Sequence, residues 1–311
     1  MNEHFIETRQ LRHLLMLAKH RNFRKASDAL FITQPALTKS IRNLESQLDV
    51  ILFDRKNQSV DPTPHCDVLL EHANRIIREL EEARHSLDVM SSDLQGQLRV
   101  GSGPVAVLGR VSDAIAAVLA AHPRVSIKIT IESWNVLTNL LREGELHFFI
   151  ADVEGVRDQK DLEIIELGRV RSVCVCRPGH PLAAGGVIEP GDLLDYPLAV
   201  PSLPRRFVQW LADNAPEGMN PEAFVERACR VSCESMTVLR RIARTTDLIT
   251  SGPSSMFQGF FDTGELIELA FEGFSDIEVA PGIAYLKDTT LPPVANALIK
   301  ELTANHGSPV Y

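Results

Sequence analysis

Apolar residues at helical spacing mark three short helices within the first fifty residues. The first runs from Glu3 to Lys19, and its expected inward positions are Leu11, Leu14, Leu15 and Ala18. Two more amphipathic helices follow, joined by Phe31-Ile32-Thr33, which is too short for anything but a tight turn. Their apolar faces are Phe23, Ala26, Ala29 and Leu30 in one, and Leu37, Ile41, Leu44 and Leu48 in the other. The pattern therefore predicts a compact three-helix unit.

Capping residues support these boundaries. Asn22 is a good N-cap for the shorter helix, and Thr33 is predicted to cap the longer one. Pro35 then falls in the first turn, where a missing N–H costs nothing. The longer helix is expected to end near Asp49.

The front of this longer helix carries polar residues away from its apolar face: Gln34, Thr38, Lys39 and Arg42, together with Pro35. All except the proline can hydrogen-bond a base edge or a phosphate. A helix-turn-helix places the first turns of its second helix in the major groove of DNA. The alternative is an ordinary helical hairpin with a solvated polar face.

A wing and a long helix are predicted next. Leu52-Phe53 and Val60 read as two short strands, with Arg55 and Lys56 near the tip, where they would reach the DNA backbone or the minor groove. Thr63-Pro64 is another helix start, with Thr63 as the cap and Pro64 in the first turn. The apolar positions that follow average 3.5 residues apart, as in a coiled coil: Leu69, Ala73, Ile76, Leu80, Ala83, Leu87, Met90 and Leu94. We interpret this segment as a dimerisation helix; the alternative is an amphipathic helix that packs on its own domain.

Beyond Gln95 the pattern changes to alternating strands and helices. The expected strands are Leu98–Gly101, Val125–Ile131 and Leu146–Ala151, and the helices between them are Val105–Ala121 and Asn135–Glu143. Such alternation is typical of a parallel α/β sheet. A second set covers residues 172–249, and further strands and a last helix lie between 266 and 305.

Charge is segregated along the chain. The net charge is -9, but residues 1–60 hold 10 Lys/Arg against 6 Asp/Glu, a difference of +4, which leaves 22 against 35, or -13, for the rest. A basic N-terminal region can bind the phosphates of DNA, whereas an acidic C-terminal region is repelled by them. The polar N-terminus and the absence of an 18-residue apolar stretch lead us to expect a cytoplasmic protein without a membrane partner.

Several motifs carry a resemblance to one family. They are AS-x-x-L at 26–30, TQPALT at 33–38, I-x-x-LE at 41–45 and LFDR at 52–55, and, more weakly, CRPGHPLA at 176–183 and DLLDYPLAVP at 192–201. With them the chain resembles the LysR-type transcriptional regulators. The family usually has an arginine where this chain has Gln58. That departure bears on the minor-groove contact and leaves the expected fold unchanged.

The resemblance implies an α/β fold class with an all-α N-terminal head. Residues 1–62 would form a winged helix-turn-helix and 63–95 a dimerisation linker helix. Residues 96–311 would form two Rossmann-like lobes similar to periplasmic solute-binding proteins: lobe I about 96–167 and 270–311, lobe II about 168–269. The implied function is sequence-specific regulation of transcription by a homodimer, or a homotetramer, on a two-fold DNA operator. A small-molecule effector would bind between the lobes, and RNA polymerase is a further candidate partner.

Ligands of such sheets lie beyond the carboxyl ends of the strands, near helix N-termini. The residues expected there are Ser102, Gly103, Pro104, Val105, Trp134, Asn135, Pro201, Ser202 and Ser235. Pro104 lacks an N–H and Trp134 offers a flat apolar surface, which favours an effector with an aromatic or apolar part. Each polar residue in this set is also an ordinary cap or loop residue.

Other chemistry finds little support in the sequence. The glycines of GSGPVAVLG do not match the dinucleotide fingerprint, and we expect no cofactor, metal or catalytic constellation. Five cysteines, with no histidine at zinc-ligand spacing, read as packing residues. The alternatives are a redox-sensing regulator that uses Cys233 at a helix start, or a cytosolic small-molecule binding protein whose helices serve only for assembly.

Thr33, Lys39 and Arg55 are expected on phosphates, and Gln34, Pro35, Thr38 and Arg42 on base edges. Replacing Gln34 by Ala should therefore relax sequence preference, whereas removing Arg55 should weaken all sites alike and flatten the salt dependence. The measurement is equilibrium binding to operator and random duplexes over a salt series. Unchanged operator affinity in both variants would show the assignments to be wrong.

Overall fold

The computed structural model describes residues 6–54, 60–89, 96–106, 109–184, 186, 188–271, 273–274 and 277–304. The chain divides into two compact units, Met1–Leu87 and Asp88–Tyr311. None of the described helices is long and apolar enough to cross a membrane.

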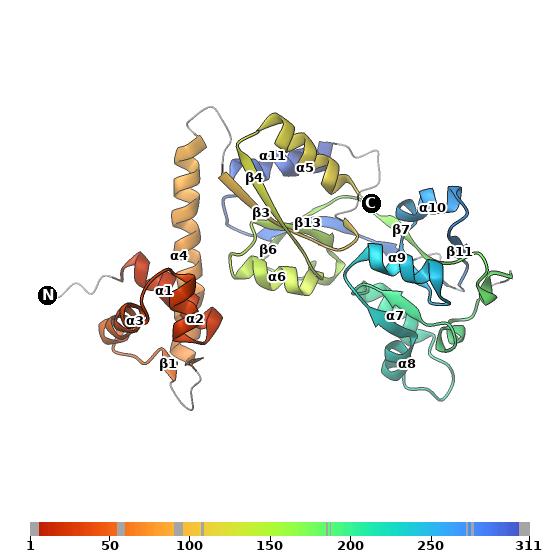
Figure 1. The fold of residues 1–311 in the computed structure, drawn as a ribbon, viewed down its shortest axis with the longest axis horizontal. Helices are drawn as coiled ribbons and strands as arrows, with labels where there is room; N and C mark the ends of the chain where they lie inside the picture. Colours follow the sequence, from red (N-terminus) through yellow and green to blue (C-terminus); the bar gives the residue numbers. More distant parts are fainter. Residues whose placement is uncertain are drawn as a thin grey trace. The chain divides into compact units, whose positions relative to one another are not determined.

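The N-terminal unit is a three-helix head followed by a small hairpin and a long helix (Figure 1). Its elements are α1 (Thr8–His20), α2 (Phe23–Ala29), α3 (Gln34–Leu48), β1 (Phe53–Asp54), β2 (Asp61–Pro62) and α4 (Pro64–Val89). The core is built from the predicted apolar faces: Leu14, Leu37, Ile41 and Leu44 have no exposed surface. The predicted helix-turn-helix and its antiparallel hairpin are therefore present.

Two of the three predicted caps form as expected. The Asn22 side chain accepts the N–H groups of Arg24 and Lys25, both at 3.0 Å. The Thr63 hydroxyl oxygen accepts the N–H of Cys66 at 3.3 Å. Thr33, however, makes no side-chain cap bond. Helix α3 therefore begins without a side-chain cap, after the extended backbone of Thr33 and with Pro35 in its first turn.

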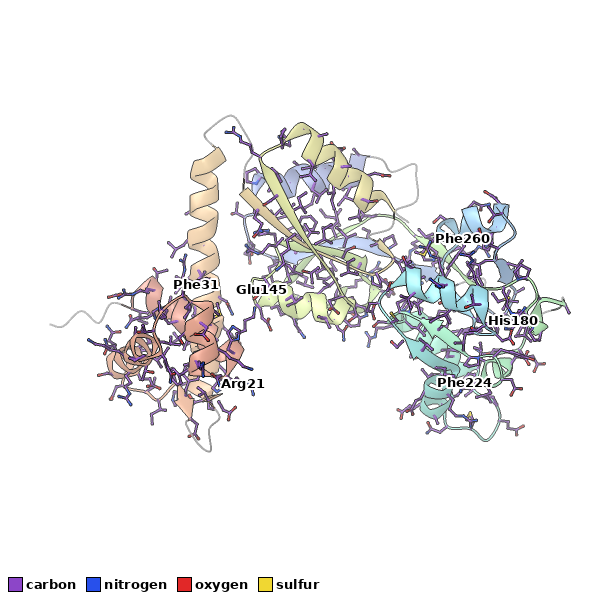
Figure 2. The ribbon with its side chains drawn as sticks, in the orientation of Figure 1. Arg21, Phe31, Glu145, His180, Phe224 and Phe260 are labelled. Atoms are coloured by element: carbon purple, nitrogen blue, oxygen red, sulfur yellow. The ribbon has the colours of Figure 1, made fainter. Side chains whose placement is uncertain are left out.

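The turn between α2 and α3 is tight, as predicted, and it needs an unusual backbone. Phe31 lies in the left-handed region with φ 55°, and its side chain is 95% exposed (Figure 2). At the far end of α3, Asp49 takes the same conformation and ends the helix. The first helix begins at Thr8 instead of Glu3; residues 1–5 lie outside the described part.

The first lobe of the C-terminal unit holds a five-stranded sheet in the order β4-β3-β5-β13-β6. Its strands are β3 (Gly96–Ser102), β4 (Val125–Ile131), β5 (Phe148–Asp152), β6 (Leu162–Glu166) and β13 (Pro281–Leu286). β3 runs parallel to both β4 and β5, as the alternation predicts. β13 runs in the opposite direction, because it is antiparallel to both of its neighbours, β5 and β6.

Helices cover both faces of this sheet (Figure 1). On one face α5 (Arg110–Ala121) packs beside α11 (Pro293–Ala304), and on the other lies α6 (Trp134–Arg142). Helix α5 begins five residues later than predicted, and residues 107–108 in that region lie outside the described part. Each face buries its own apolar cluster, centred on Phe148 and on Phe149.

The second lobe is built around β7 (Val170–Cys176). Its neighbours β10 (Thr250–Pro253), β11 (Ile267–Leu269) and β12 (Glu278–Val279) are all antiparallel to it. The predicted parallel arrangement is therefore wrong around β7, because these strands return alongside it in the opposite direction. It holds for β8 (Leu198–Val200), which is parallel to β9 (Cys229–Ser232) and forms a parallel bridge from Leu198 to Ile249.

The remaining helices of this lobe are α7 (Arg205–Asp213), α8 (Pro221–Ala228), α9 (Met236–Thr245) and α10 (Gln258–Asp262). It also contains short 3-10 turns at Pro181–Ala184, Pro190–Leu194 and Ser254–Phe257. The first lobe has one such turn among its described residues, at Glu154–Val156. The chain passes between the lobes in two places, after β6 and after β12. These passages place the carboxyl ends of several strands from both lobes around one cavity.

Ile41→Ala should destabilise the N-terminal unit alone. Removing a fully buried side chain from this core costs about 2–5 kcal/mol. Both tryptophans, Trp134 and Trp210, belong to the C-terminal unit, so their fluorescence follows that unit during urea unfolding. We expect the far-UV circular dichroism transition to begin at lower urea while the fluorescence midpoint stays fixed.

The control is Gln34→Ala at an exposed position of the same helix, which should leave both transitions in place. A fluorescence midpoint that falls together with the dichroism signal in Ile41→Ala would contradict separate cores.

Candidate functional sites

The polar front of α3 faces outward in the structure. Gln34, Pro35, Lys39 and Arg42 are exposed, and so is Thr33, while Thr38 is half-buried. Within the described part of the chain, no carboxylate forms an ion pair with Lys39 or Arg42. Two cationic groups therefore stand free on one face of this helix.

Buried polar contacts fix the orientation of α3 against α1. The Gln10 side-chain amide donates to Gln47 Oε1 at 2.8 Å, and His13 Nδ1 lies 2.7 Å from the Ser40 hydroxyl. Burial lowers the pKa of His13, and the nearby Arg9 lowers it further. A neutral imidazole fits this contact, because either tautomer can share a hydrogen bond with a hydroxyl.

The wing is tied to α3 by a single carboxylate. Glu45 Oε1 accepts the N–H of Leu52 at 3.0 Å and that of Phe53 at 3.3 Å. The start of β1 is therefore positioned by the helix next to it. Arg55 and Lys56, the basic residues expected at the tip of the wing, lie outside the described residues.

The predicted apolar seam of α4 divides into two parts. Ala73 is buried and Leu69 half-buried, both within the core of the N-terminal unit. Further along, Ile76 and Leu80 are 45% and 46% exposed. Met90 and Leu94 lie outside the described residues. The middle of α4 thus presents large aliphatic side chains that its own unit leaves uncovered.

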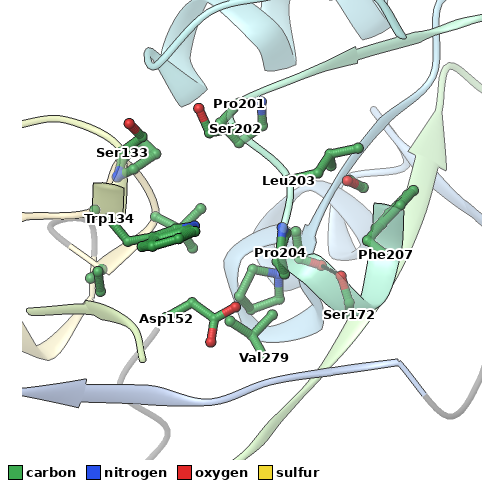
Figure 3. Close-up of a pocket in the computed structure, with 18 residues that line it drawn as sticks. Ser133, Trp134, Asp152, Ser172, Pro201, Ser202, Leu203, Pro204, Phe207 and Val279 are labelled. Carbon is green, nitrogen blue, oxygen red and sulfur yellow. Dashed lines mark hydrogen bonds between the residues drawn. The ribbon is translucent and has the colours of Figure 1, made fainter. Parts of the chain in front are cut away.

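A cavity of about 600 Å³, counted to its open mouth, lies between the two lobes of the C-terminal unit (Figure 3). The first lobe supplies the turn after β3, the start of α6 and the end of β5. The second lobe supplies the turn after β8, the start of α7 and parts of β7, β10 and β12. The lining residues are Gly103, Pro104, Val105, Ala106, Ser133, Trp134, Ala151, Asp152, Ser172, Pro201, Ser202, Leu203, Pro204, Phe207, Ser251, Gly252, Pro253 and Val279.

Six of the nine residues expected at an effector site line this cavity: Gly103, Pro104, Val105, Trp134, Pro201 and Ser202. The other three do not. Ser102 is fully buried and its hydroxyl donates to the Gly103 carbonyl. Asn135 is exposed, and its side-chain oxygen accepts the Ser133 hydroxyl. Ser235 occupies the N-cap position of α9 without a side-chain cap bond and is not part of the lining.

Asp152 is the charged lining residue that the sequence reasoning missed. It ends β5, one residue beyond the predicted strand, so the rule of strand ends would have reached it. Its Oδ1 accepts the N–H of Glu154 at 3.1 Å. Burial raises the pKa of Asp152, and the hydrogen bond from Glu154 opposes that shift.

Two further polar contacts stand at the rim of the cavity. Arg206 from α7 donates to Glu154 Oε1 of the first lobe at 3.0 Å, so an ion pair joins the two lobes. In the second lobe, both the N–H and the hydroxyl of Ser202 donate to Glu234 Oε1, at 3.0 and 2.6 Å. Neither pairing was visible from sequence spacing.

The cysteines do not gather into a site. All five are free, and the described residues contain no group of three or more metal-binding side chains. Burial raises the pKa of Cys66 and of Cys176 to about 12, raises that of Cys229 to about 11, and holds that of Cys174 far above its usual range. The redox alternative based on the half-buried Cys233 stays a prediction.

Comparisons with known proteins define the class. Residues 8–67 match the model of the bacterial regulatory helix-turn-helix protein, lysR family, and residues 91–307 match the LysR substrate binding domain. The protein is thus a DNA-binding transcriptional regulator with an effector-binding domain. The chain belongs to the LysR family.

Relatives and solved structures match this chain over nearly its whole length. The chain is 33% identical over 299 residues to the SDS degradation transcriptional activation protein of a Pseudomonas species, covering 94% of each chain. It is 29% identical to the HTH-type transcriptional regulator GbpR of Azospirillum brasilense, over 96% of this chain and 88% of that one.

Its fold is similar to that of ArgP from Mycobacterium tuberculosis, with a TM-score of 0.66 at 17% identity over 98% of both chains. It is also similar to that of full-length CbnR complexed with its target DNA, with a TM-score of 0.59 at 17% identity over 96% of this chain and 99% of that one. At this level of identity the two structures support the fold alone.

The raised pKa of Cys229 predicts slow alkylation. A thiol with a pKa of about 11 remains protonated at pH 8, so its reaction with iodoacetamide should speed up about tenfold per pH unit up to pH 10. Peptide mapping by mass spectrometry measures the rate, and the urea-unfolded chain, in which all five thiols are free to react, is the control. A rate that levels off near pH 9, about where an ordinary thiol does, would contradict this environment.

Proposed function

We propose that this regulator binds DNA as a homodimer held together by the exposed seam of α4. Ile76 and Leu80 are uncovered in the single chain, and they continue an apolar spacing of 3.5 that suits pairing with a second copy. Two heads on one dimer would read a two-fold operator, with half-sites one helical turn of DNA or a multiple of it apart. Further pairing into a homotetramer and contact with RNA polymerase are compatible extensions of the same arrangement.

The exposed front of α3 is the observation that carries this proposal. We assign Gln34, Pro35, Thr38 and Arg42 to base edges in the major groove, and Thr33 and Lys39 to phosphates. Arg55 and Lys56 are assigned to the backbone or minor groove from the sequence alone. The free cationic groups of Lys39 and Arg42 support these roles, because an ion pair within the protein would compete with a phosphate.

The cavity between the lobes is proposed as the effector site. It is concave and lined by residues of both lobes, so a bound molecule would contact the two together. A ligand that prefers one placement of the lobes over another shifts the equilibrium between them. Coupling of this kind to the DNA-binding heads typically amounts to about 1–3 kcal/mol.

Leu80→Asp tests dimerisation through α4. A carboxylate in the centre of an apolar seam opposes pairing because it would be buried without a partner. We expect sedimentation velocity to show a shift from dimer to monomer. Binding of a two-fold operator, followed by fluorescence anisotropy, should weaken by about 10²–10⁴ because the two heads no longer act together.

Val68→Asp is the matched control, since Val68 is 61% exposed on the same helix but lies outside the seam. It should remain dimeric and bind the operator as the unmodified chain does. A Leu80→Asp protein that stays dimeric with full operator affinity would refute this use of α4.

A further inference from the structure

The lining of the inter-lobe cavity is apolar with one acidic exception. Among the described residues that line it, Asp152 alone carries a charge, and none is lysine, arginine or histidine. Trp134, Leu203 and Phe207 are large apolar side chains of the lining, drawn from both lobes (Figure 3). A molecule in this space would therefore bury apolar surface and would meet a single carboxyl group.

Several backbone donors of the lining are missing or already used. Four of its residues, Pro104, Pro201, Pro204 and Pro253, have no N–H. The N–H of Gly103 donates to the Ile150 carbonyl at 2.7 Å. Anionic ligands need several free N–H or O–H groups, because a buried carboxylate or sulfate without them is costly.

Ser202 and Ser133 of the lining already donate their hydroxyls within the protein. Ser202 directs both its N–H and its hydroxyl to Glu234 Oε1. The Ser133 hydroxyl donates to Asn135. Glu234 thus occupies the position that the carboxylate of a bound anion would take on the turn after β8.

Negative charge dominates the surroundings. Asp152 lines the cavity, Glu154 and Glu234 lie beside it, and Arg206, next to the lining residue Phe207, forms an ion pair with Glu154. One carboxylate oxygen each of Glu154 and Glu234 is buried without a hydrogen-bond partner in the structure. An anionic ligand would be repelled here, and the repulsion is strong where water is excluded.

We propose that the effector is an uncharged, largely apolar molecule that carries a hydroxyl group, and that this hydroxyl bonds to the carboxyl of Asp152 between Trp134 and the turn after β8. This inference rests on the proposed effector role of the cavity. It specifies the chemical class of the ligand, an apolar alcohol or phenol, in place of a carboxylate or other anion.

Asp152 suits a hydroxyl better than an ammonium group. An ammonium brings three donors and a full charge that must leave water, and the described lining offers a single carboxyl group to balance that charge. A hydroxyl has one donor and accepts as well, so it pairs with the carboxyl in either protonation state. The raised pKa of Asp152 agrees with a group that meets little water.

The apolar side of the cavity is held in place by a close backbone contact. A Cβ added at Gly155 would lie 2.8 Å from two atoms of the Trp134 ring, so only glycine allows the indole to rest there. The ring therefore has a fixed support beside Asp152. This arrangement positions an apolar surface next to the single polar group.

The test measures binding to the full chain by titration calorimetry with two matched triplets. One is 1-octanol, octanoate and octylammonium; the other is benzyl alcohol, benzoate and benzylammonium. Within at least one triplet the alcohol should bind about tenfold or more tightly than both charged analogues. Using two carbon skeletons separates the head group from the shape of the apolar body.

Asp152→Asn provides the residue-level test. The amide keeps the shape and removes the charge, so alcohol binding should weaken about tenfold, because a hydrogen bond to a charged group is replaced by a neutral one. The preference for alcohol over carboxylate should shrink with it. Asp158→Asn, the same change at an exposed position of the same lobe, is the control and should bind like the unmodified chain.

The outcomes are distinct. A carboxylate or an ammonium that binds best would overturn the proposed ligand class but leave the cavity as an effector site. Equal behaviour of the Asp152 and Asp158 variants would overturn the role of Asp152. If none of the six compounds binds at up to about 1 mM, the proposed ligand class fails, whereas the effector role of the cavity is decided by the placement of the lobes and not by these six compounds.

Discussion

Burial of one face of α3 is the constraint on which the DNA-binding head depends. Leu37, Ile41 and Leu44 have no exposed surface, and each contributes roughly 1.5–3 kcal/mol by leaving water. Turning the helix to hide its polar front would expose these three side chains, at a cost comparable to the stability of a small domain. The helix therefore has one orientation, and its opposite face is left for a partner. Apolar packing sets which face of α3 is buried, and the hydrogen bonds of His13 and Glu45 further fix the position of the helix against α1 and β1.

In the C-terminal unit, burial of apolar sheet faces likewise decides which surfaces remain open to a partner. Each lobe has its own buried clusters, so neither needs the other to form a core. What the lobes share is the space beyond their strand ends, where helix starts and turns leave room that side chains do not fill. Two passages of chain and the ion pair between Arg206 and Glu154 join the lobes across that space. A molecule bound in this cavity would change the placement of one lobe relative to the other, because the two walls belong to lobes with separate cores.

The elements of the N-terminal head were predicted well from the sequence, because helices, caps and tight turns depend on residues that are close together in the chain. Asn22 and Thr63 cap as expected, and the motif at 33–38 sits at the start of α3. Prediction failed where distant residues decide. The antiparallel direction of β10 and β11, the pairing of Arg206 with Glu154, and the engagement of Ser202 by Glu234 all join residues far apart in the sequence. Asp152 was missed for a smaller reason: its strand runs one residue further than the apolar pattern showed.

The central claim is that the exposed front of α3 contacts DNA. Its most direct test is the acetylation rate of individual lysines, measured by mass spectrometry with and without a duplex that the full chain has enriched from a random pool. Lys39 lies on the exposed front, whereas Lys128 and Lys300 are exposed on the C-terminal unit. The account predicts that bound duplex slows acetylation of Lys39 severalfold and leaves Lys128 and Lys300 unchanged. Acetylation of Lys39 at the same rate under saturating duplex would contradict it.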